Sequence, residues 1–168
     1  MPTAVSLFSG AGGFCEGVRL AGFKVVCAVE MDGYAARTHS ANFPKVPMFR
    51  GDVKRFLVDA QPGVPSKREL IDGGVDLVYG GPPCQGFSQI GPRDLKDPRN
   101  LLYLEFARVL KALKPKAFIM ENVPCQSAFK FDPVSASNFD PFARRGLAVA
   151  LASSELAGIA ETWRARVA

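Results

Sequence analysis

The sequence predicts an α/β fold in which a mostly parallel sheet carries helices on both faces. Short apolar runs alternate five times with helix-type segments, and parallel strands need such helical crossovers. The chain has 168 residues, 48% hydrophobic and 22% charged, which suits one soluble domain with a sizeable core. No stretch approaches the roughly 18 apolar residues of a membrane span, so we expect a cytoplasmic protein with no membrane partner.

Strands are expected where short runs of β-branched and apolar residues are stopped by glycine, proline or an acidic residue. These runs cover 4–8, 24–29, 46–49, 75–79 and 117–120. Each run is short and mostly apolar, which is typical of strands that are buried on both faces of a sheet.

Helices are expected between these strands, over about 13–21, 33–42, 53–59 and 97–113. The last is the clearest, because Asp97 supplies an N-cap, Pro98 suits the first helical position, and apolar residues then recur at helical spacing. Residues 61–74 are rich in proline, glycine and charge, and we expect a loop there.

The composition changes after Pro124, which divides the chain into a region over 1–124 and a divergent segment over 125–168. Residues 125–143 are polar and rich in phenylalanine, and we expect a loop. Residues 146–167 are rich in alanine and predict a helix. This helix is a candidate to cover the open sheet edge beside the fifth strand, where unpaired backbone groups favour association.

A cluster of glycine or polar residues follows every predicted strand at its carboxyl end. The clusters occupy 8–13, 30–31, 51–53, 80–88 and 121–124. Ligands of parallel α/β sheets bind beyond the carboxyl ends of the strands. Five clusters at one edge therefore predict one functional site.

The first cluster, Phe8-Ser9-Gly10-Ala11-Gly12-Gly13, is a glycine loop between a strand and a helix. Its backbone can approach a ligand closely and offer free N–H groups. Glu30 lies twenty residues past Gly10, where nucleotide-binding folds place a ribose-binding carboxylate. The alternative is a tight turn with a surface acid. Asp52 is either an acceptor for an adenine amino group or the cap of the helix expected over 53–59.

The segment from Gly80 to Ser88 is the sharpest chemical signal. Two prolines stiffen the chain just before Cys84, and a rigidly mounted thiol is what nucleophilic catalysis needs. A buried structural cysteine is the usual alternative, and it suits Cys15 and Cys27 better. Glu121 ends the neighbouring strand, where it either faces Cys84 and hydrogen-bonds a ring nitrogen of a base or caps a turn.

Charge and cysteine spacing narrow the choice of ligands. None of the four cysteines forms a C-x-x-C pair and His39 is the only histidine, so we expect reduced thiols and no metal. The net charge of +5 mildly favours an anionic partner, with seven basic and four acidic residues over 85–124. We interpret Lys111, Lys114 and Lys116 as a solvated helix end in preference to a nucleic-acid contact.

In this order, the motifs over residues 4–124 resemble those of the DNA cytosine-5 methyltransferases. The resemblance implies a Rossmann-like S-adenosylmethionine-dependent methyltransferase fold, incomplete at its C-terminal end. It also makes 1–124 the cofactor-binding and catalytic half. The resemblance assigns cofactor binding to Phe8, Ser9, Gly10, Gly12, Gly13, Phe14, Glu30, Met31, Asp52, Val53, Pro82 and Leu102.

The resemblance also implies the chemistry. A cytosine is flipped out of double-stranded DNA, the Cys84 thiolate adds to C6 of the ring, and Glu121 binds N3 and the amino group. Cys84 and Glu121 are therefore the expected catalytic residues, and S-adenosylmethionine is the expected methyl donor. Contacts to the DNA are assigned to Pro83, Gln85, Ser88, Arg93, Asn122 and Val123.

A complete family member carries a later Gln-x-Arg-x-Arg motif and a target-recognition domain, and the sequence contains neither. We therefore expect a chain truncated before these elements. It is the catalytic half of a restriction–modification or orphan methyltransferase, or a non-catalytic fragment that at most binds the cofactor, or a module completed by a second chain. An RNA cytosine-5 methyltransferase is a further alternative. A dinucleotide oxidoreductase is remote, because Cys15 replaces the third glycine of its motif and Cys84 is left unexplained.

Overall fold

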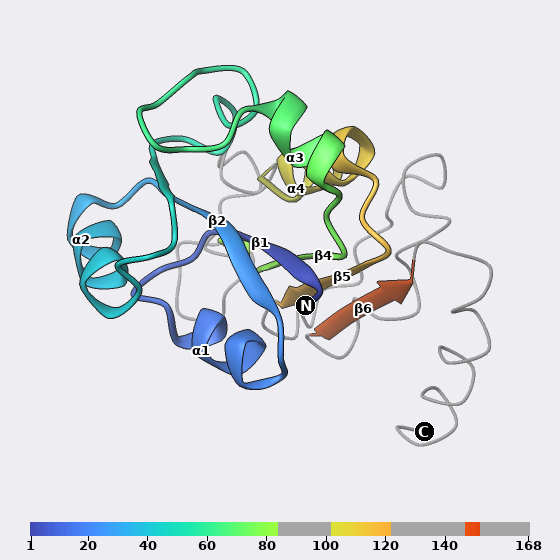
Figure 1. Cartoon of the computed structure of the whole chain (residues 1–168), viewed down its shortest axis with the longest axis horizontal. Coiled ribbons are helices and arrows are strands. Elements are labelled where there is room, and N and C mark those ends of the chain that lie inside the picture. Colours follow the sequence, from blue (N-terminus) through green and yellow to red (C-terminus); the bar gives the residue numbers. More distant parts are fainter. Residues whose placement is uncertain (84–101, 122–146, 152–168) are drawn as a thin grey trace, which may run out of the picture.

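The computed structural model describes residues 1–83, 102–121 and 147–151. Its strands form one sheet in the order β3-β2-β1-β4-β5-β6 (Figure 1). They are β1 (Thr3–Leu7), β2 (Lys24–Glu30), β3 (Met48–Arg50), β4 (Leu77–Gly80), β5 (Ala117–Glu121) and β6 (Leu147–Leu151). The first five are parallel and β6 is antiparallel to β5, which confirms the mostly parallel sheet.

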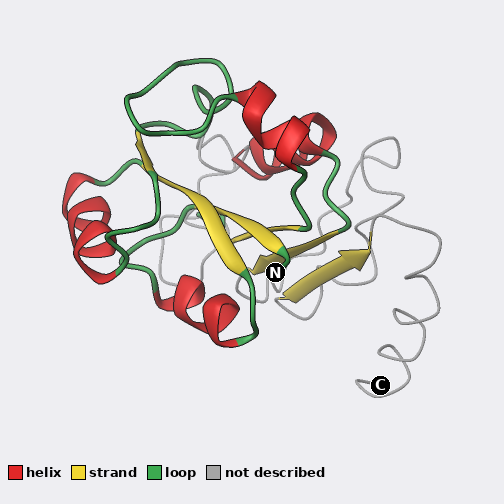
Figure 2. Cartoon of the chain, viewed as in Figure 1, coloured by secondary structure: helices red, strands yellow, loops and turns green. Residues whose placement is uncertain are grey.

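Within the described ranges, four helices cover the two faces of the sheet (Figure 2). They are α1 (Gly13–Leu20), α2 (Gly33–Asn42), α3 (Lys67–Gly73) and α4 (Leu102–Leu113). The first two lie on one face and the other two on the opposite face. The chain builds outward from β1 to β3 and then returns to add β4 on the other side of β1. This reversal is the topological switch point at which doubly wound sheets bind ligands.

Side chains from both faces of the sheet form the core. On one face, Phe106 and Val109 of α4 are fully buried, and the Phe106 ring meets Phe118 of β5 edge-on at 6.2 Å. On the other face, Cys15 of α1 packs in one cluster with Tyr79 of β4. Each buried apolar side chain contributes about 1.5–3 kcal/mol of transfer free energy, so the two clusters fix the helices against the sheet.

The short helix expected over 53–59 is wrong, because the structure has successive turns there. Leu57 adopts a left-handed backbone with φ of 70°, which interrupts any helical run. The carbonyl oxygens of Val53 and Phe56 accept hydrogen bonds from the side chain of Arg108. A contact from a distant helix therefore shapes this segment.

The loop expected over 61–74 contains α3, so that prediction is wrong at Lys67–Gly73. The helix begins with a capping box in which the Ser66 hydroxyl accepts from the Glu69 amide at 3.2 Å and Glu69 accepts from the Ser66 amide at 2.7 Å. Leu70 is buried against the sheet. The Ser-x-x-Glu spacing is a local signal for a helix start, and proline and glycine around it obscured the helix.

The helix expected over 146–167 is wrong at 147–151, where the chain forms β6. This strand pairs with β5 from Leu147 opposite Glu121 to Leu151 opposite Ala117. Periodicity alone does not separate a short apolar strand from a helical segment, and the unpaired edge of β5 offered backbone partners. The rest of 146–167 lies outside the described residues, and the division at residue 124 stays a prediction.

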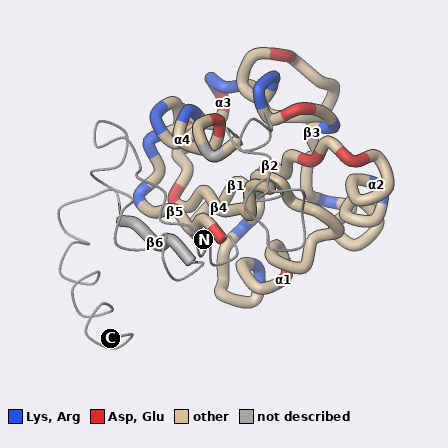
Figure 3. The backbone as a smooth tube through the Cα atoms, turned by 180° about the vertical axis from the view of Figure 1, so that it is seen from behind, with Lys and Arg blue, Asp and Glu red and all other residues tan. Residues whose placement is uncertain are grey.

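The C-terminal end of α4 carries exposed lysines. Lys111, Lys114 and Lys116 are exposed, and Lys116 forms an ion pair with Asp76 at 2.6 Å. They lie near the amino ends of the strands, where α4 leads into β5 (Figure 3). This edge is opposite the one at which the predicted site residues gather. None of the helices in the described ranges is long and apolar enough to cross a membrane.

Candidate functional site

A cavity of about 330 Å³ lies at the carboxyl ends of the central strands, within the size range of small-molecule sites. It is formed where β1, β2, β3 and β4 end and α4 begins. The residues that line it are Phe8, Val29, Glu30, Met31, Gly51, Asp52, Val53, Lys54, Gly81, Pro83 and Leu102.

Half of the predicted cofactor residues meet around this cavity. Those lining it are Phe8, Glu30, Met31, Asp52, Val53 and Leu102. Those not among its lining residues are Ser9, Gly10, Gly12, Gly13, Phe14 and Pro82. The sequence interpretation did not select Val29, Gly51, Lys54 and Gly81, and it assigned Pro83 to DNA. Each of these four unselected residues is next in sequence to a selected one. Their position at or just after the end of a strand is the sequence feature that could have identified them.

The glycine loop needs glycine at Gly12 for two reasons. Its φ is 102°, and a Cβ there would stand 2.3 Å from the ring of Phe43. Gly12 is the N-cap of α1 and has no side-chain cap, while its amide donates to the carbonyl of Ser9 at 3.1 Å. The loop therefore turns tightly and leaves the first N–H groups of α1 without a side-chain partner at the site edge.

Two predicted cofactor residues, Ser9 in this loop and Phe14 directly after it, have distinct surroundings. Ser9 is buried, and its hydroxyl has no hydrogen-bond partner within the described part of the chain. Phe14 packs edge-on against Tyr79 with a ring distance of 4.9 Å, on the face covered by α1. Ser9 thus has an unused polar atom, whereas the observed contact of Phe14 is a core contact.

Glu30 ties the end of β2 to the glycine loop. One carboxylate oxygen accepts from the Gly10 amide at 2.8 Å and the other accepts from the Asp32 amide at 2.8 Å. Because each carboxylate oxygen has two lone pairs, both can still accept from a ligand hydroxyl. The carboxylate is therefore held in one place at the rim of the cavity.

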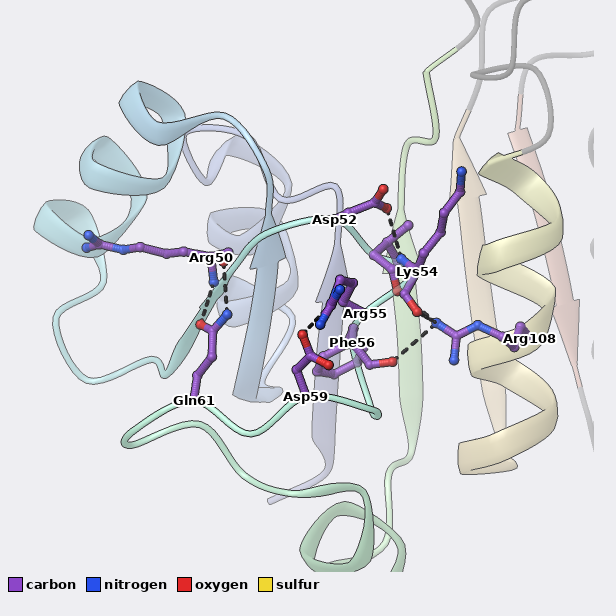
Figure 4. A network of polar contacts seen from close by, with 9 residues as sticks. Arg50, Asp52, Lys54, Arg55, Phe56, Asp59, Gln61 and Arg108 are labelled. Carbon is purple, nitrogen blue, oxygen red and sulfur yellow. Dashed lines mark hydrogen bonds and ion pairs between the residues drawn. The ribbon is translucent and has the colours of Figure 1, made fainter.

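Asp52 and Met31 form the outer part of the same wall. Asp52 accepts the amide of Lys54 at 2.9 Å through Oδ1 (Figure 4), so it caps a turn instead of the expected helix. Its Oδ2 has no partner among the residues that the structure describes and remains free to accept an amino group. The side chain of Met31 is 70% exposed, which leaves its apolar surface available to a ligand.

The segment leading to Cys84 begins at Gly80, where β4 leaves no room for a side chain beside β1. A Cβ on Gly80 would stand 2.0 Å from the carbonyl oxygen of Leu7 on β1. A Cβ on Gly81 would stand 3.0 Å from a carboxylate oxygen of Glu121. Glu121 therefore faces the chain that leads to Cys84. Six predicted residues lie outside the described ranges: Cys84, Gln85, Ser88, Arg93, Asn122 and Val123.

The described thiols are structural. Cys15 and Cys27 are free and fully buried, and burial raises the pKa of the Cys27 thiol to about 12. A thiol that stays protonated is a poor nucleophile. No three histidine, cysteine or acidic side chains gather as a metal site in the ranges the structure covers.

A doubly wound sheet with an acid-rimmed cavity at its switch point defines the class of α/β proteins that bind nucleotide-like cofactors. Residues 3–133 match the family of C-5 cytosine-specific DNA methylases. The chain belongs to this family, as its motifs predict.

Individual relatives agree with this assignment. The chain is 42% identical over 119 residues to the type II methyltransferase M.DdeI of Desulfomicrobium norvegicum, covering 71% of the chain and 27% of the relative. It is 43% identical over 120 residues to M.AquIA of Picosynechococcus, covering 71% and 47%. An Escherichia coli prophage protein assigned as a DNA modification methyltransferase superposes with a TM-score of 0.62 at 37% identity, covering 82% and 36%. The chain thus spans half or less of the length of these proteins.

Proposed function

We propose that this chain is the cofactor-binding and catalytic half of a DNA cytosine-5 methyltransferase of the restriction–modification or orphan type. The carrying observation is the convergence of Phe8, Glu30, Asp52 and Leu102 on one cavity beside the segment that leads to Cys84. The names of the relatives, which are type II methyltransferases, support DNA as the substrate class.

The chemistry of the cavity fits S-adenosylmethionine. Glu30 offers acceptors for the two ribose hydroxyls, and Oδ2 of Asp52 offers one for the adenine amino group. The side chains of Phe8, Met31 and Leu102 give apolar surface for the adenine ring. When bound, S-adenosylmethionine supplies a methyl group on a positively charged sulfur.

Cys84 and Glu121 carry the reaction on the base. The Cys84 thiolate forms a bond to C6 of a flipped cytosine, which makes C5 nucleophilic. Glu121 hydrogen-bonds N3 and the amino group and stabilises the charge that develops there. After C5 is methylated, a base removes the C5 proton, the C5–C6 double bond reforms, and Cys84 leaves as a thiolate.

The contacts to DNA come from the segments after β4 and β5. Ser88 and Arg93 are suited to phosphate oxygens, which position a duplex without reading its sequence. The other DNA-contact residues of this proposal are Pro83, Gln85, Asn122 and Val123.

Transfer needs sequence beyond this chain under the same proposal. The chain covers 27% and 47% of two relatives and contains no Gln-x-Arg-x-Arg motif. A second chain or a continuation of this one supplies that motif and the target-recognition segment. The free thiols of Cys15 and Cys27 suit a reducing compartment, so we place the protein in the cytoplasm.

Two measurements test the proposal. Calorimetry compares S-adenosylmethionine with NAD, and labelled methyl transfer is measured with duplex DNA and with tRNA. We expect the chain to bind S-adenosylmethionine and not NAD. We expect no methyl transfer until the missing half is added. Cys84→Ala is expected to abolish transfer by the completed enzyme while cofactor binding is unchanged.

Each of the other possible outcomes overturns a different part of the proposal. Preferred binding of NAD overturns the cofactor assignment. Transfer to tRNA but not to DNA makes the protein an RNA enzyme. Efficient DNA methylation by this chain alone overturns the need for a second half, and normal turnover by Cys84→Ala removes its role as the nucleophile.

A further inference from the structure

Arg108 joins helix α4 to the turn that follows β3. Its Nη2 donates to the carbonyl oxygens of Val53 at 2.7 Å and Phe56 at 3.2 Å, with a longer contact to Lys54 at 3.4 Å. Figure 4 shows the guanidinium reaching from α4 toward these carbonyl groups. Hydrogen bonds from a charged donor are stronger than those between neutral groups, so this side chain is a substantial link.

The turn has short-range backbone hydrogen bonds of its own, such as those from the amides of Arg55 and Phe56 to the carbonyls of Asp52 and Val53 at 2.9 and 3.1 Å. Leu57 has a φ of 70°, which prevents the segment from continuing as a helix. The carbonyl of Phe56 has no backbone partner within the described part of the chain, and Arg108 satisfies it. Phe56 itself is 1% exposed and meets Phe49 at 5.5 Å, so an unsatisfied carbonyl here would be costly.

Arg108 is itself held in one orientation. Its Nε donates to Glu105 at 2.6 Å, one turn earlier on α4. The side chains of Arg108 and Glu105 are only 35% and 24% exposed. Because a guanidinium is planar, fixing Nε also fixes the direction in which Nη2 points.

The same turn and the same helix line the candidate cofactor cavity. Asp52, Val53 and Lys54 form one part of its wall, and Leu102 at the start of α4 forms another. Leu102 and Arg108 are six residues apart, or about 9 Å along a helix. Arg108 therefore links two elements that both contribute to the cavity wall, although it is not itself a lining residue.

We propose that Arg108 is a positioning residue that holds the Asp52–Phe56 turn against α4 and thereby sets the affinity of the cavity for an adenosine-containing ligand. This inference rests on the proposed function for the identity of the ligand. Its structural part, the fixing of the turn, is independent of that identity.

The test uses the full chain with two variants of Arg108 and two controls. Arg108→Met removes all of the carbonyl contacts. Arg108→Lys keeps the positive charge but lacks the planar guanidinium and its several N–H donors. Glu105→Gln weakens the ion pair but leaves the carbonyl contacts. Arg68→Ala removes an exposed arginine whose ion pair among the described residues is with Asp72. The dissociation constant for S-adenosylhomocysteine, the unfolding temperature without ligand and amide hydrogen exchange over 52–59 are measured for each.

We expect Arg108→Met to weaken binding of S-adenosylhomocysteine at least about tenfold, as the loss of charged hydrogen bonds implies. The affinity is measured well below the unfolding temperature of the variant, so that the loss does not reflect unfolding. Arg108→Lys is expected to recover part of this loss. Exchange of the Arg55, Phe56 and Asp59 amides is expected to rise about tenfold or more, while amides of β1 and β2 are unchanged. Arg68→Ala is expected to stay within about twofold of wild type in affinity. Glu105→Gln, whose amide oxygen can still accept from Nε, is expected to weaken binding less than Arg108→Met does.

A merely structural role gives a different pattern. If Arg108→Met lowers the unfolding temperature but leaves the affinity and the local exchange unchanged, the positioning role is overturned. If exchange rises locally and affinity does not change, the turn is held by Arg108 but does not control the cavity, which also overturns the proposal. If the wild-type chain binds neither S-adenosylmethionine nor S-adenosylhomocysteine, the proposed function fails, and exchange alone decides whether Arg108 holds the turn.

Discussion

Replacing Gly80 by alanine should destabilise the protein severely, because β1 and β4 approach each other too closely for a side chain. The new Cβ would stand 2.0 Å from the carbonyl oxygen of Leu7 and 2.8 Å from its carbonyl carbon. Gly80 pairs with Leu7 in the parallel ladder. The obstacle is therefore backbone at the centre of the sheet, and no change of side-chain rotamer relieves it.

The size of the effect follows from the displacement that the clash requires. Contacts shorter than 3.0 Å essentially never occur for a Cβ, so the two strands must separate locally by about 1 Å. A ladder hydrogen bond of about 2.9 Å would then lengthen beyond its useful range. Buried backbone groups left unsatisfied cost about 1–3 kcal/mol each. One broken ladder bond leaves a donor and an acceptor, so the loss is about 2–6 kcal/mol, a large share of a typical total of about 5–15 kcal/mol.

Urea unfolding followed by far-UV circular dichroism measures this loss, with Gly17→Ala as the matched control. Gly17 lies inside α1 and a Cβ there meets nothing within 4 Å, so alanine should stabilise by about 0.5–1 kcal/mol. With a slope of about 1–3 kcal/mol per molar urea, Gly80→Ala should lower the midpoint by about 1 M or more. Equal midpoints for Gly80→Ala and wild type would refute the argument from close strand approach.

Three further predictions follow from other contacts. Asp76 accepts from Lys116 and from the Thr3 amide at 2.7 Å, and these contacts hold its pKa below the ordinary 3.8. Its stabilisation is therefore complete above that value and is lost as the pH falls through the lowered pKa. Asp76→Asn should lower the melting temperature at pH 7 but not in strong acid, and an equal deficit at both would contradict this. Burial raises the pKa of Cys27 to about 12, so this thiol should react with a thiol reagent at pH 8 only after unfolding. Mass spectrometry of labelled peptides checks this. Rapid labelling of the native chain would contradict the burial of Cys27 in β2. Ser66→Ala removes the cap of α3 and should cost about 1 kcal/mol in urea unfolding, whereas Arg68→Ala, which breaks only an exposed pair, should change stability by less.

Local sequence patterns were sufficient for the central sheet and for the edge at which the site lies. The runs that became β1, β2 and β5 are apolar and end in glycine or acid, and the helices between them carry recognisable stops. Glu30 was selected from its place after β2, and the structure puts its carboxylate on the Gly10 amide. These features are readable because each depends on residues close together in sequence.

Two of the wrong predictions lie where contacts from a distant segment determine the backbone conformation. Residues 53–59 were expected to be helical, but their turn is set by Arg108, 55 positions after Val53. Residues 147–151 were expected to be helical, but they pair with β5, which offered open backbone groups. α3 is a different kind of error, since its Ser66–Glu69 box was present in the sequence.

By itself, the sequence determined the parallel fold, the family, and the set of residues from which a site is built at the carboxyl ends of the strands. Only the tertiary structure decided that Phe8, Glu30, Asp52 and Leu102 share one cavity, that Gly80 lies against Leu7, and that Arg108 holds the turn after β3. The physical reason is the distance along the sequence over which the interactions act. Strand and helix periodicity arises from neighbouring residues, whereas cavity walls and carbonyl contacts arise from packing between segments that the sequence separates by tens of residues.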